Sequence, residues 1–559
     1  MTEVNVINDL RSIVGSAGDL VYVKYHSQPW DTGGGMFMWR TGAENSLFIN
    51  LSSYYGIDNN GTLIKVAGNN TGRWVRQYDD YISLAHFGGC KDMYATVALQ
   101  AAIDFAAANV STSNAPTRGS AIFIPGGTYV INEVTLKYGV QLIGNSIDQP
   151  IINATLPGEP GYSFGTGYLF NMAADVIQIE ISNLNILGRN TSDKGCFYFN
   201  AQPGSPAPSD DGGIWHSSFK NIKISGFKGH SIYSKGGTTG DLPNQSLVFE
   251  LINIEMSPLA PMTSSALKIT GQNGQILFLD SGFNGFQDTA TNPPTYHKGH
   301  VVSISRDPSV TAAFPATISF LTSTFQSGDY GVYMDYVENI TFDNCWFERL
   351  GVAVSIDGTT NECRSINVLN SRFANAAGYG SAPASSGNLI NNGVCVNITN
   401  ARATVANNYV TVTNPNDSRI LNDSFIIAQG LGGAINPGVE VFGNTFADPR
   451  LNKTSGISQV VTTISGGAVN CGYNKFLYVN TTTPVPVITN INSGLVETET
   501  LYIRANGGDL KFNTGGNIYL TGRGGVNPVL VLQNGEVAGF TKIGSNLYQL
   551  TSLVKYTTP

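Results

Sequence analysis

The sequence has little charge and no concentration of basic residues. Only 13% of its 559 residues are charged, and the formal net charge is −8. Nucleic-acid-binding proteins need clustered Lys and Arg to contact phosphates, so we expect no nucleic-acid partner. The six cysteines are scattered without a CxxC pair. This spacing argues against a zinc site and favours buried free thiols, and we expect neither a metal nor another cofactor.

Targeting and membrane-spanning segments are also missing. No apolar run approaches the roughly 20 residues that a membrane span needs. The first residues, MTEVNVINDLRSIV, lack the basic region and apolar core of a secretory signal. We therefore expect a soluble protein made in a reducing cytoplasm.

Glycine, tyrosine and phenylalanine are abundant instead, with 64, 25 and 27 copies, which indicates an all-β protein rich in turns. One pattern returns between residues 175 and 475: apolar-x-apolar, a corner that often contains Asn, and a further apolar or aromatic residue. A separate short strand follows. Copies of the first half begin at Ile181, Phe219, Phe249, Phe278, Phe320, Phe342, Val368, Val405 and Val441. Spacings of about 22 to 42 residues are typical of coils of a parallel β-helix, with loops added at the corners.

The pattern divides the chain into three predicted domains. Residues 1–80 read as a small N-terminal β neck module of short strands broken by Gly and Asn. Residues 81–475 read as the parallel β-helix, with a helix over 94–110 that covers its first coil. Residues 476–559 have a different composition and read as a C-terminal β domain that caps the β-helix or holds a trimer together.

Two segments carry a family resemblance. Residues 123–129 (FIPGGTY), preceded by the helix and followed by 139–144 (GVQLIG), resemble the opening of the pectate-lyase-like β-helix of bacteriophage tailspikes. Residues 72–77 and 85–89 resemble the neck that joins such a β-helix to its virion anchor. In organisation the chain is most similar to the tailspikes of Acinetobacter podoviruses, over residues 5–475.

The resemblance implies a right-handed parallel β-helix in a homotrimer that recognises and depolymerises a bacterial capsular or surface polysaccharide. It also implies a place in the virion tail, with attachment to the tail or baseplate through an N-terminal anchor that we expect to be absent from this chain. One departure is that the acidic run usual before the helix is reduced here to one acid, in the segment 91–96 (KDMYAT). The family has no universal catalytic motif, so catalytic residues have to be argued from this sequence.

Stacking of the coils places equivalent outward residues in columns about 4.7 to 4.9 Å apart. One predicted column holds Leu187, Ser225, Glu255, Asn284, Gln326, Glu348 and Ala374. The column beside it holds Asn185, Lys223, Asn253, Gly282, Thr324, Trp346 and Arg372. A third, from the separate short strands, holds Thr270, Ser305, Asp335, Asp357 and Asn397.

Residues 332–357 contain most of the candidate site. Glu348 lies between the aromatic pair Trp346-Phe347 and Arg349, and we predict it as a catalytic acid. The alternative is an exposed Glu paired with Arg349. Asp335 is a second catalytic candidate because it should lie about 5 Å from Asp357, a separation that suits a retaining glycosidase. The alternative for these aspartates is a structural role at a turn.

The remaining candidates surround these acids. Asp329 is the third catalytic candidate, since it should lie one coil before Glu348. Trp346 and Tyr333 are predicted sugar platforms, and the predicted substrate-binding cations are Arg349, Arg372 and Arg306. Hydrolysis is the favoured chemistry, because no tight Asp cluster or run of Lys supports the alternative of a polysaccharide lyase. A third possibility is a glycan-binding adhesin without activity.

Overall fold

A computed structural model describes most of the chain. The described residues are 1–29, 31–41, 58–78, 81–108, 121–172, 176–190, 192–201, 213–237, 244–288, 295–307, 313–374, 394–411, 424–429, 438–447, 454–455, 459–461, 468–472, 476–480, 487–493, 500–506, 509–514, 516–520, 529–533, 536–544 and 547–554. They form two compact units, Met1–Tyr333 and Met334–Pro559. These units differ from the three domains predicted from the sequence, and that division stays a prediction.

The first unit begins with a five-stranded sheet. Its strands, in spatial order, are β1 (Thr2–Val6), β2 (Leu20–Tyr25), β3 (Gly35–Thr41), β5 (Gly72–Arg76) and β4 (Leu63–Ile64). A 3₁₀ helix, η1 (Ile7–Ser12), follows β1. In the core under this five-stranded sheet, the Trp39 and Trp74 rings meet edge to face, with centroids 5.2 Å apart. Aromatic pairs in this geometry stabilise a small core beyond the area that they bury.

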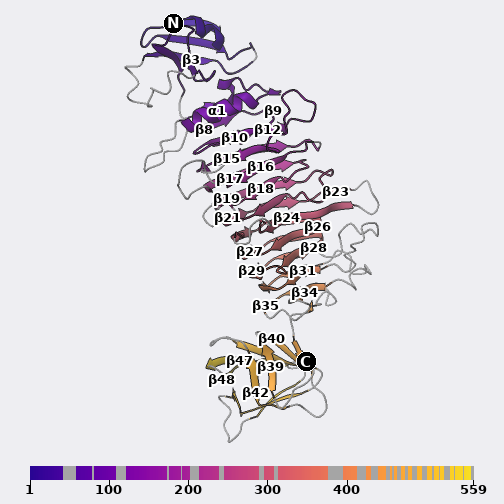
Figure 1. Ribbon diagram of the computed structural model, residues 1–559. Helices are drawn as coiled ribbons and strands as arrows, with labels where there is room; N and C mark the ends of the chain where they lie inside the picture. Colours follow the sequence, from indigo (N-terminus) through magenta and orange to yellow (C-terminus); the bar gives the residue numbers. More distant parts are fainter. Residues whose placement is uncertain are drawn as a thin grey trace. The chain divides into compact units, whose positions relative to one another are not determined.

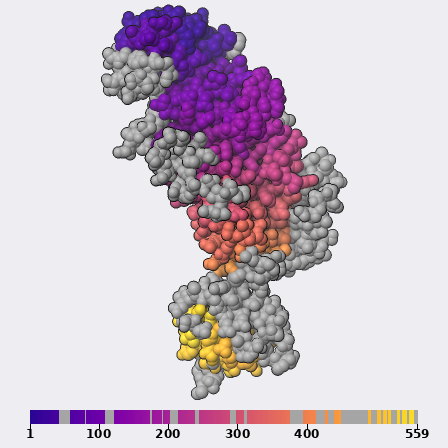
Figure 2. Space-filling model, in the orientation of Figure 1, coloured from indigo at the N-terminus to yellow at the C-terminus, as the bar shows by residue number. Residues whose placement is uncertain are grey.

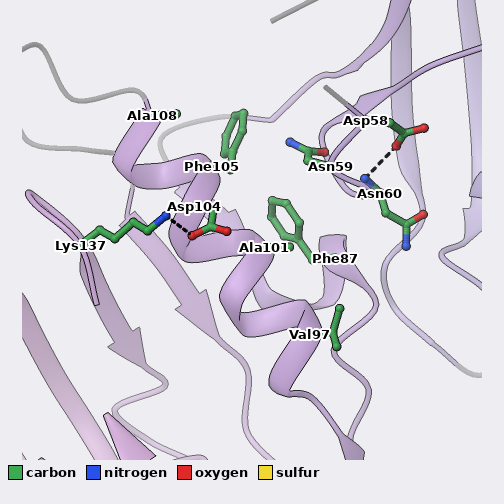
Figure 3. Close-up of a pocket in the computed structure, with 10 residues that line it drawn as sticks. All are labelled: Asp58, Asn59, Asn60, Phe87, Val97, Ala101, Asp104, Phe105, Ala108 and Lys137. Carbon is green, nitrogen blue, oxygen red and sulfur yellow. Dashed lines mark hydrogen bonds and ion pairs between the residues drawn. The ribbon is translucent and has the colours of Figure 1, made fainter. Parts of the chain in front are cut away.

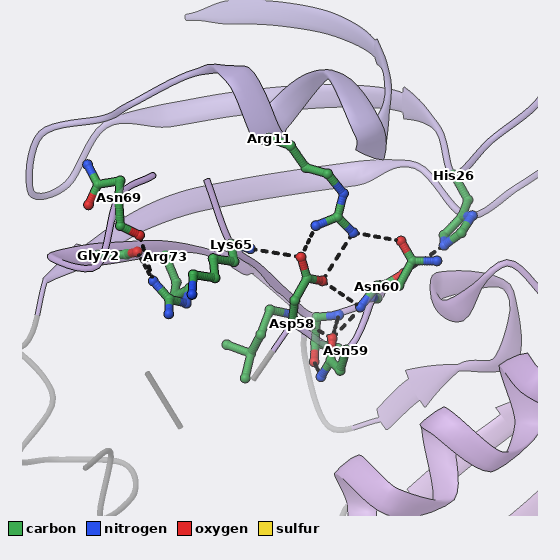
Figure 4. A network of polar contacts seen from close by, with 12 residues as sticks. Arg11, His26, Asp58, Asn59, Asn60, Lys65, Asn69, Gly72 and Arg73 are labelled. Atoms are coloured by element: carbon green, nitrogen blue, oxygen red, sulfur yellow. Dashed lines mark hydrogen bonds and ion pairs between the residues drawn. The ribbon is translucent and has the colours of Figure 1, made fainter. Parts of the chain in front are cut away.

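A polar network holds the segment before β4 against the rest of this sheet (Figure 4). The Asp58 carboxylate pairs with Arg11 and accepts hydrogen bonds from the backbone N–H groups of Asn60 (3.0 Å) and Lys65 (3.2 Å). The His26 ring donates from Nε2 to the Asn60 carbonyl oxygen at 2.7 Å. The carboxylate of Asp58 is therefore occupied by structural contacts.

Helix α1 (Thr96–Ala108) covers the first coil, within the predicted 94–110. It is preceded by β6 (Tyr81–Ser83), the 3₁₀ helix η3 (Leu84–Phe87) and β7 (Met93–Tyr94). Its apolar face, which includes Leu99 and Ile103, is fully buried, and Figure 1 shows the helix beside β8 and β10. Covering the end coil removes an exposed sheet edge and an open core from water.

The coils of the first unit contain three rows of parallel strands, which we call the first, second and third sheets. The first sheet holds β8 (Ala121–Ile124), β11 (Gln141–Gly144), the starts of β15 (Glu180–Leu187), β17 (Ile214–Ser225) and β19 (Asn244–Glu255), then β21 (Asn273–Leu279) and β25 (Ala316–Leu321). The second holds β9 (Thr128–Ile131), β12 (Ile151–Ala154), the ends of β15, β17 and β19, then β22 (Gly282–Asn284) and the start of β26 (Thr324–Asp335). The third holds β10 (Val134–Leu136), β13 (Tyr168–Met172), β16 (Gly195–Asn200), β18 (Ile232–Lys235), β20 (Leu267–Thr270) and β24 (Thr295–Ser305). Two short strands, β14 (Val176–Ile177) and β23 (Gln287–Asp288), pair at their margins.

The second unit repeats this arrangement. Its first sheet holds β27 (Glu338–Asp343), β29 (Cys363–Leu369), β32 (Ala401–Ala406) and β35 (Val439–Phe442). Its second sheet holds the start of β28 (Trp346–Asp357), then β30 (Arg372–Ala374), β33 (Tyr409–Thr411) and β36 (Thr445–Phe446). Its third holds the end of β28, then β31 (Val394–Thr399), β34 (Ser424–Gln429) and β37 (Thr454–Ser455). The predicted fold, an all-β protein with a right-handed parallel β-helix, is confirmed.

The last strands of the second unit form three smaller sheets. One has the order β38 (Gln459–Val461), β40 (Phe476–Asn480), β43 (Thr500–Asn506), β47 (Val537–Gly544), β48 (Leu547–Val554) and β45 (Ile518–Tyr519). The others pair β39 (Ala468–Gly472) with β42 (Asn490–Ser493), and β41 (Val487–Ile488) with β44 (Leu510–Asn513) and β46 (Val529–Leu532). Buried residues from Ile488 to Tyr548 form a hydrophobic core of their own. Across the described residues, no helix has the length and apolar character to cross a membrane.

The interior of the coils is built from stacked aromatic rings. In the first unit Phe219, Phe249, Phe278 and Phe320 stack face to face, with centroids 4.7 to 4.8 Å apart. This spacing equals the distance between neighbouring strands, so each coil contributes one ring to the stack. Figure 2 shows the described residues of the first unit, indigo to magenta, as one packed body.

The predicted corners lie between the first and second sheets and have left-handed backbone. The corner residues of the first unit with positive φ are Asn183, Asn221, Leu251, Asp280 and Thr322, and those of the second unit are Asn344, Asn370 and Asn407. Asn and Asp tolerate this conformation better than other residues with a side chain. The preference explains why Asn recurs in the sequence pattern.

Leu251 and Thr322 are the exceptions at this corner. Leu251 has φ of 56° and a side chain that is 47% exposed. We expect Leu251→Asn to stabilise the protein by about 0.5–1 kcal/mol, because it relieves the left-handed strain and loses little buried area. Denaturant unfolding measures the change. Leu251→Ala is the matched control, since it shortens the side chain but keeps the strain, and an equal gain in that variant would refute the explanation.

Candidate functional site

The structure places the predicted outward columns of the second unit in register. Trp346 pairs with Arg372, and Arg372 pairs with Tyr409 on the following coil. Glu348 pairs with Ala374 in the adjacent column. Tyr409 was not among the sequence candidates, although it stands at the same offset from its Asn corner as Arg372.

These residues form an exposed row of alternating aromatic and cationic groups on the second sheet. The Arg372 guanidinium lies 4.5 Å from the centroid of the Trp346 ring and 5.7 Å from that of Tyr409. The rings are 37% and 42% exposed. Cation–π contact holds the guanidinium in place, and its planar donors can bind carboxylate or hydroxyl oxygens. Because Arg372 covers one face of Trp346, only the opposite face remains for a sugar ring.

Glu348 lies beside this row with a partly exposed carboxylate. Its side chain is 24% exposed, and Oε1 lies 3.5 Å from Nε of Arg349. Arg349 has φ of 55°, so the chain turns there from the second sheet into the third. The neighbouring residue in the Glu348 column is the small Ala374, which is buried.

Asp335 and Asp357 both lie close to one buried thiol. Burial raises the pKa of Cys363 to about 11, and the negative charges of Asp335 and Asp357 contribute to the shift. Asp357 accepts hydrogen bonds from the N–H (3.0 Å) and the hydroxyl (2.6 Å) of Thr359. This is the turn geometry expected of an aspartate with a structural role, the alternative to a catalytic one.

One predicted column is wrong. Asp357 pairs with Thr399, and Asn397 pairs with Ser355, whereas the sequence pattern placed Asn397 in the column of Asp357. The true register lies two residues away from the predicted one. A shift of two residues keeps the same side chains inside the coil, so burial alone could not distinguish the two registers.

Glu348 lies near the start of β28 and Asp357 at its end. The roughly eight residues of extended chain after the corner span about 25 Å, whereas paired glycosidase carboxylates are about 5 to 9.5 Å apart. Since Asp335 shares the surroundings of Asp357, the roles of Glu348 and Asp335 are separate predictions and not those of one carboxylate pair.

The other candidates belong to the first unit. The Tyr333 ring stacks on His300 with centroids 4.4 Å apart, and His300 meets Tyr330 edge to face at 5.0 Å. Burial lowers the pKa of His300 to about 4. Burial, with a contribution from the nearby Asp329, raises the pKa of Tyr330. The last candidate, Arg306, follows strand β24.

A pocket of about 440 Å³ opens beside helix α1 (Figure 3), and its lining includes none of the predicted site residues. The Asp104 carboxylate in its wall pairs with Lys137 at 2.7 Å, and Asp58 is held by Arg11. Both acids are engaged in ion pairs. Within the described ranges, no group of His, Cys, Asp or Glu is arranged to hold a metal ion.

Two family models match the chain. Residues 3–79 match the phage tail protein small four-stranded β-sheet domain. Residues 82–278 match rhamnogalacturonase A/epimerase, pectate lyase-like. For these residues the predicted resemblance is confirmed. No curated protein matches the chain.

Solved structures of similar fold include two phage proteins and one bacterial enzyme. The tailspike protein gp49 of Acinetobacter baumannii bacteriophage Fri1, a capsular polysaccharide depolymerase, is 13% identical, with a TM-score of 0.47, over 100% of this chain and 92% of its own. The tailspike protein of Acinetobacter baumannii phage AM24 is 13% identical, with a TM-score of 0.45, over 97% and 85%. The A-module of the mannuronan C-5 epimerase AlgE4 of Azotobacter vinelandii is 13% identical, with a TM-score of 0.44, over 69% and 100%.

Proposed function

We propose that this chain, in which a phage-tail β-sheet domain precedes a pectate-lyase-like β-helix, is a virion tail protein that binds and hydrolyses a bacterial capsular or surface polysaccharide. The observation that carries the proposal is the exposed row Trp346, Arg372 and Tyr409 beside the Glu348 carboxylate. Aromatic faces and charged donors side by side suit a polymer of pyranose rings with acidic substituents. The active form is proposed to be a homotrimer.

In the proposed hydrolysis Glu348 donates a proton to the oxygen of the leaving sugar, as a general acid. Hydrolysis also needs a second carboxylate, which either attacks the anomeric carbon or activates a water. Asp335 and Asp329 are proposed as catalytic carboxylates independently of Glu348. Arg372, Arg349 and Arg306 bind acidic or hydroxyl groups of the substrate. Trp346, through its uncovered face, and Tyr333 hold sugar rings in place.

The match of residues 82–278 to a pectate-lyase-like family favours polysaccharide lyase as the second candidate. In β-elimination a base removes the proton at C5 of a uronic acid while a cation neutralises its carboxylate. Incubating the protein with purified capsular polysaccharide and analysing the oligosaccharides separates the two reactions. Hydrolysis leaves saturated ends, and ultraviolet-absorbing unsaturated uronate would refute it. Binding without any cleavage would indicate an adhesin.

Arg372→Met is expected to raise KM about tenfold with little change in kcat. The variant removes a charged donor that contacts the substrate in ground and transition states alike. Steady-state rates on purified polysaccharide measure both constants. Arg364→Met is the control, since Arg364 is an exposed residue of β29 that pairs with Glu362 at 3.1 Å. A fall in kcat with KM unchanged would contradict a role in binding.

A further inference from the structure

A ladder of tyrosine rings follows the outward side of the third sheet in the first unit. Asn171, Tyr198, Tyr233, Lys268 and Ser303 are register partners on five consecutive strands, β13, β16, β18, β20 and β24. The Tyr198 and Tyr233 rings stack with centroids 5.3 Å apart. The coil repeat alone explains why these five positions line up, but it does not explain why tyrosines and a lysine occupy them.

The ladder is closed at its first end by Tyr168 and at its other end by a cation. The Tyr168 ring stacks on Tyr198 at 4.8 Å. Gly195 makes room for it, because a Cβ there would lie 2.3 Å from Cε1 of Tyr168. Nζ of Lys268 lies 5.1 Å from the centroid of the Tyr233 ring. The ring faces are therefore covered by one another and by the ammonium group.

Lys268 is half-buried and, among the residues that the structure describes, makes no hydrogen bond and no ion pair. Burial lowers its pKa, and the negative charge of Asp307 partly offsets this effect. Asp307 is 8% exposed. A half-buried ammonium with three donors and no acceptor is costly unless something binds it.

The neighbouring Tyr233 hydroxyl and His230 ring do not supply that acceptor. The Tyr233 hydroxyl is hydrogen-bonded to the Thr270 hydroxyl at 3.1 Å. The His230 ring accepts the Ser265 N–H at Nδ1 (3.0 Å), and burial, followed by the charge of Lys268, lowers its pKa to about 3. His230 is therefore neutral at physiological pH and adds no charge to the cluster.

The side chains in the column become small directly after Lys268. Its register partner on β24 is Ser303, a small residue, whereas the preceding partners are large tyrosines. Two other residues lie near Ser303 in the sequence. His300, which stacks on Tyr333, comes three residues before it, and Asp307 comes just after strand β24 ends. A hydroxyl group on a small side chain therefore stands next to the Lys268 ammonium in the column.

We propose that Lys268 and Ser303 form a subsite for the carboxylate of an acidic sugar, on a different sheet and in a different unit from the Glu348 row. The proposal rests on the proposed function, because it takes the ligand to be part of the same polysaccharide. The carboxylate accepts hydrogen bonds from the Lys268 ammonium and the Ser303 hydroxyl, and the tyrosine ladder fixes the position of the ammonium. Charge-assisted hydrogen bonds of this type are roughly twice as strong as neutral ones.

The test measures binding to a panel of purified capsular polysaccharides that contain uronic acid, each paired with its carboxyl-reduced form. Surface plasmon resonance on the immobilised polymers reports affinity whether or not they are cleaved. Lys268→Met is expected to lower the affinity for the acidic polymer about tenfold, and carboxyl reduction is expected to remove the difference between the variant and the wild type. Lys220→Met is the control, because Lys220 is an exposed lysine of the same unit that pairs with Glu250 at 2.9 Å.

The outcomes separate a failure of the Lys268 subsite from a failure of the proposed polysaccharide-binding function. Unchanged affinity in a folded Lys268→Met protein, or wild-type binding that survives carboxyl reduction, would overturn the subsite and leave the proposed function standing. If the wild type binds no polymer of the panel, both proposals fail. A melting temperature equal to that of the wild type shows that Lys268→Met has not acted through the fold.

Discussion

Glu348→Gln is expected to lower the rate of depolymerisation by about 10²- to 10⁴-fold, the usual contribution of a general acid. Glutamine has nearly the same shape as glutamate but cannot donate a proton to the leaving sugar oxygen. The Trp346, Arg372 and Tyr409 row is unchanged in this variant, so affinity for the polysaccharide is expected to change by no more than about twofold. Reducing-end assays measure the rate, and surface plasmon resonance measures the affinity.

Glu255→Gln is the matched control for this experiment. Glu255 stands at the same place in the coil pattern, between Ser225 and Asn284 in its column, and the residue two positions before it is Asn253 and not an aromatic. We expect this variant to keep full activity. Full activity in Glu348→Gln would remove Glu348 from the site, and Asp335→Asn and Asp329→Asn would then identify the acid. None of these results bears on the fold.

The coil repeat could be predicted from the sequence because its cause is local. Corners with left-handed backbone select Asn, and alternating apolar residues mark the inward side of each strand. These two signals placed Trp346 opposite Arg372 and Glu348 opposite Ala374, as the structure shows. They failed where the alternation alone had to set the register, at Asn397, because a shift of two residues costs no buried side chain.

The contacts of the candidate side chains could not be predicted in this way. That Arg372 lies over the Trp346 ring depends on side-chain directions, although both residues were candidates. Tyr409 belongs to the copy of the pattern that begins at Val405, one coil beyond the end of the predicted column at Arg372. Lys268 looked unremarkable in the sequence, since its lack of an acceptor follows from the partners that the fold gives to Tyr233 and His230.

Phe278→Ala is expected to destabilise the first unit by about 3–5 kcal/mol, the usual loss when a buried Phe is truncated. Phe278 is 0% exposed and stacks on Phe249 at 4.7 Å and on Phe320 at 4.8 Å. The truncation leaves a cavity and breaks the stack at both faces. Denaturant unfolding, followed by circular dichroism, measures the loss. Phe164→Ala is the control, because Phe164 is 55% exposed, and it is expected to change stability by less than about 0.5 kcal/mol.

Hydrogen exchange can show whether this loss stays near the cavity. In a repeat fold each coil contacts only its neighbours, so stability is close to a sum of terms for single coils and for the interfaces between them. Amides of β19, β21 and β25, which pair with one another around Phe278, should lose protection first. Amides of β8 and β11, several coils away in the same unit, should keep theirs. Equal loss of protection in both groups would mean that the coils of the first unit unfold together. The stability of the fold would then not be a sum of terms for single coils, although its geometry is a repeat.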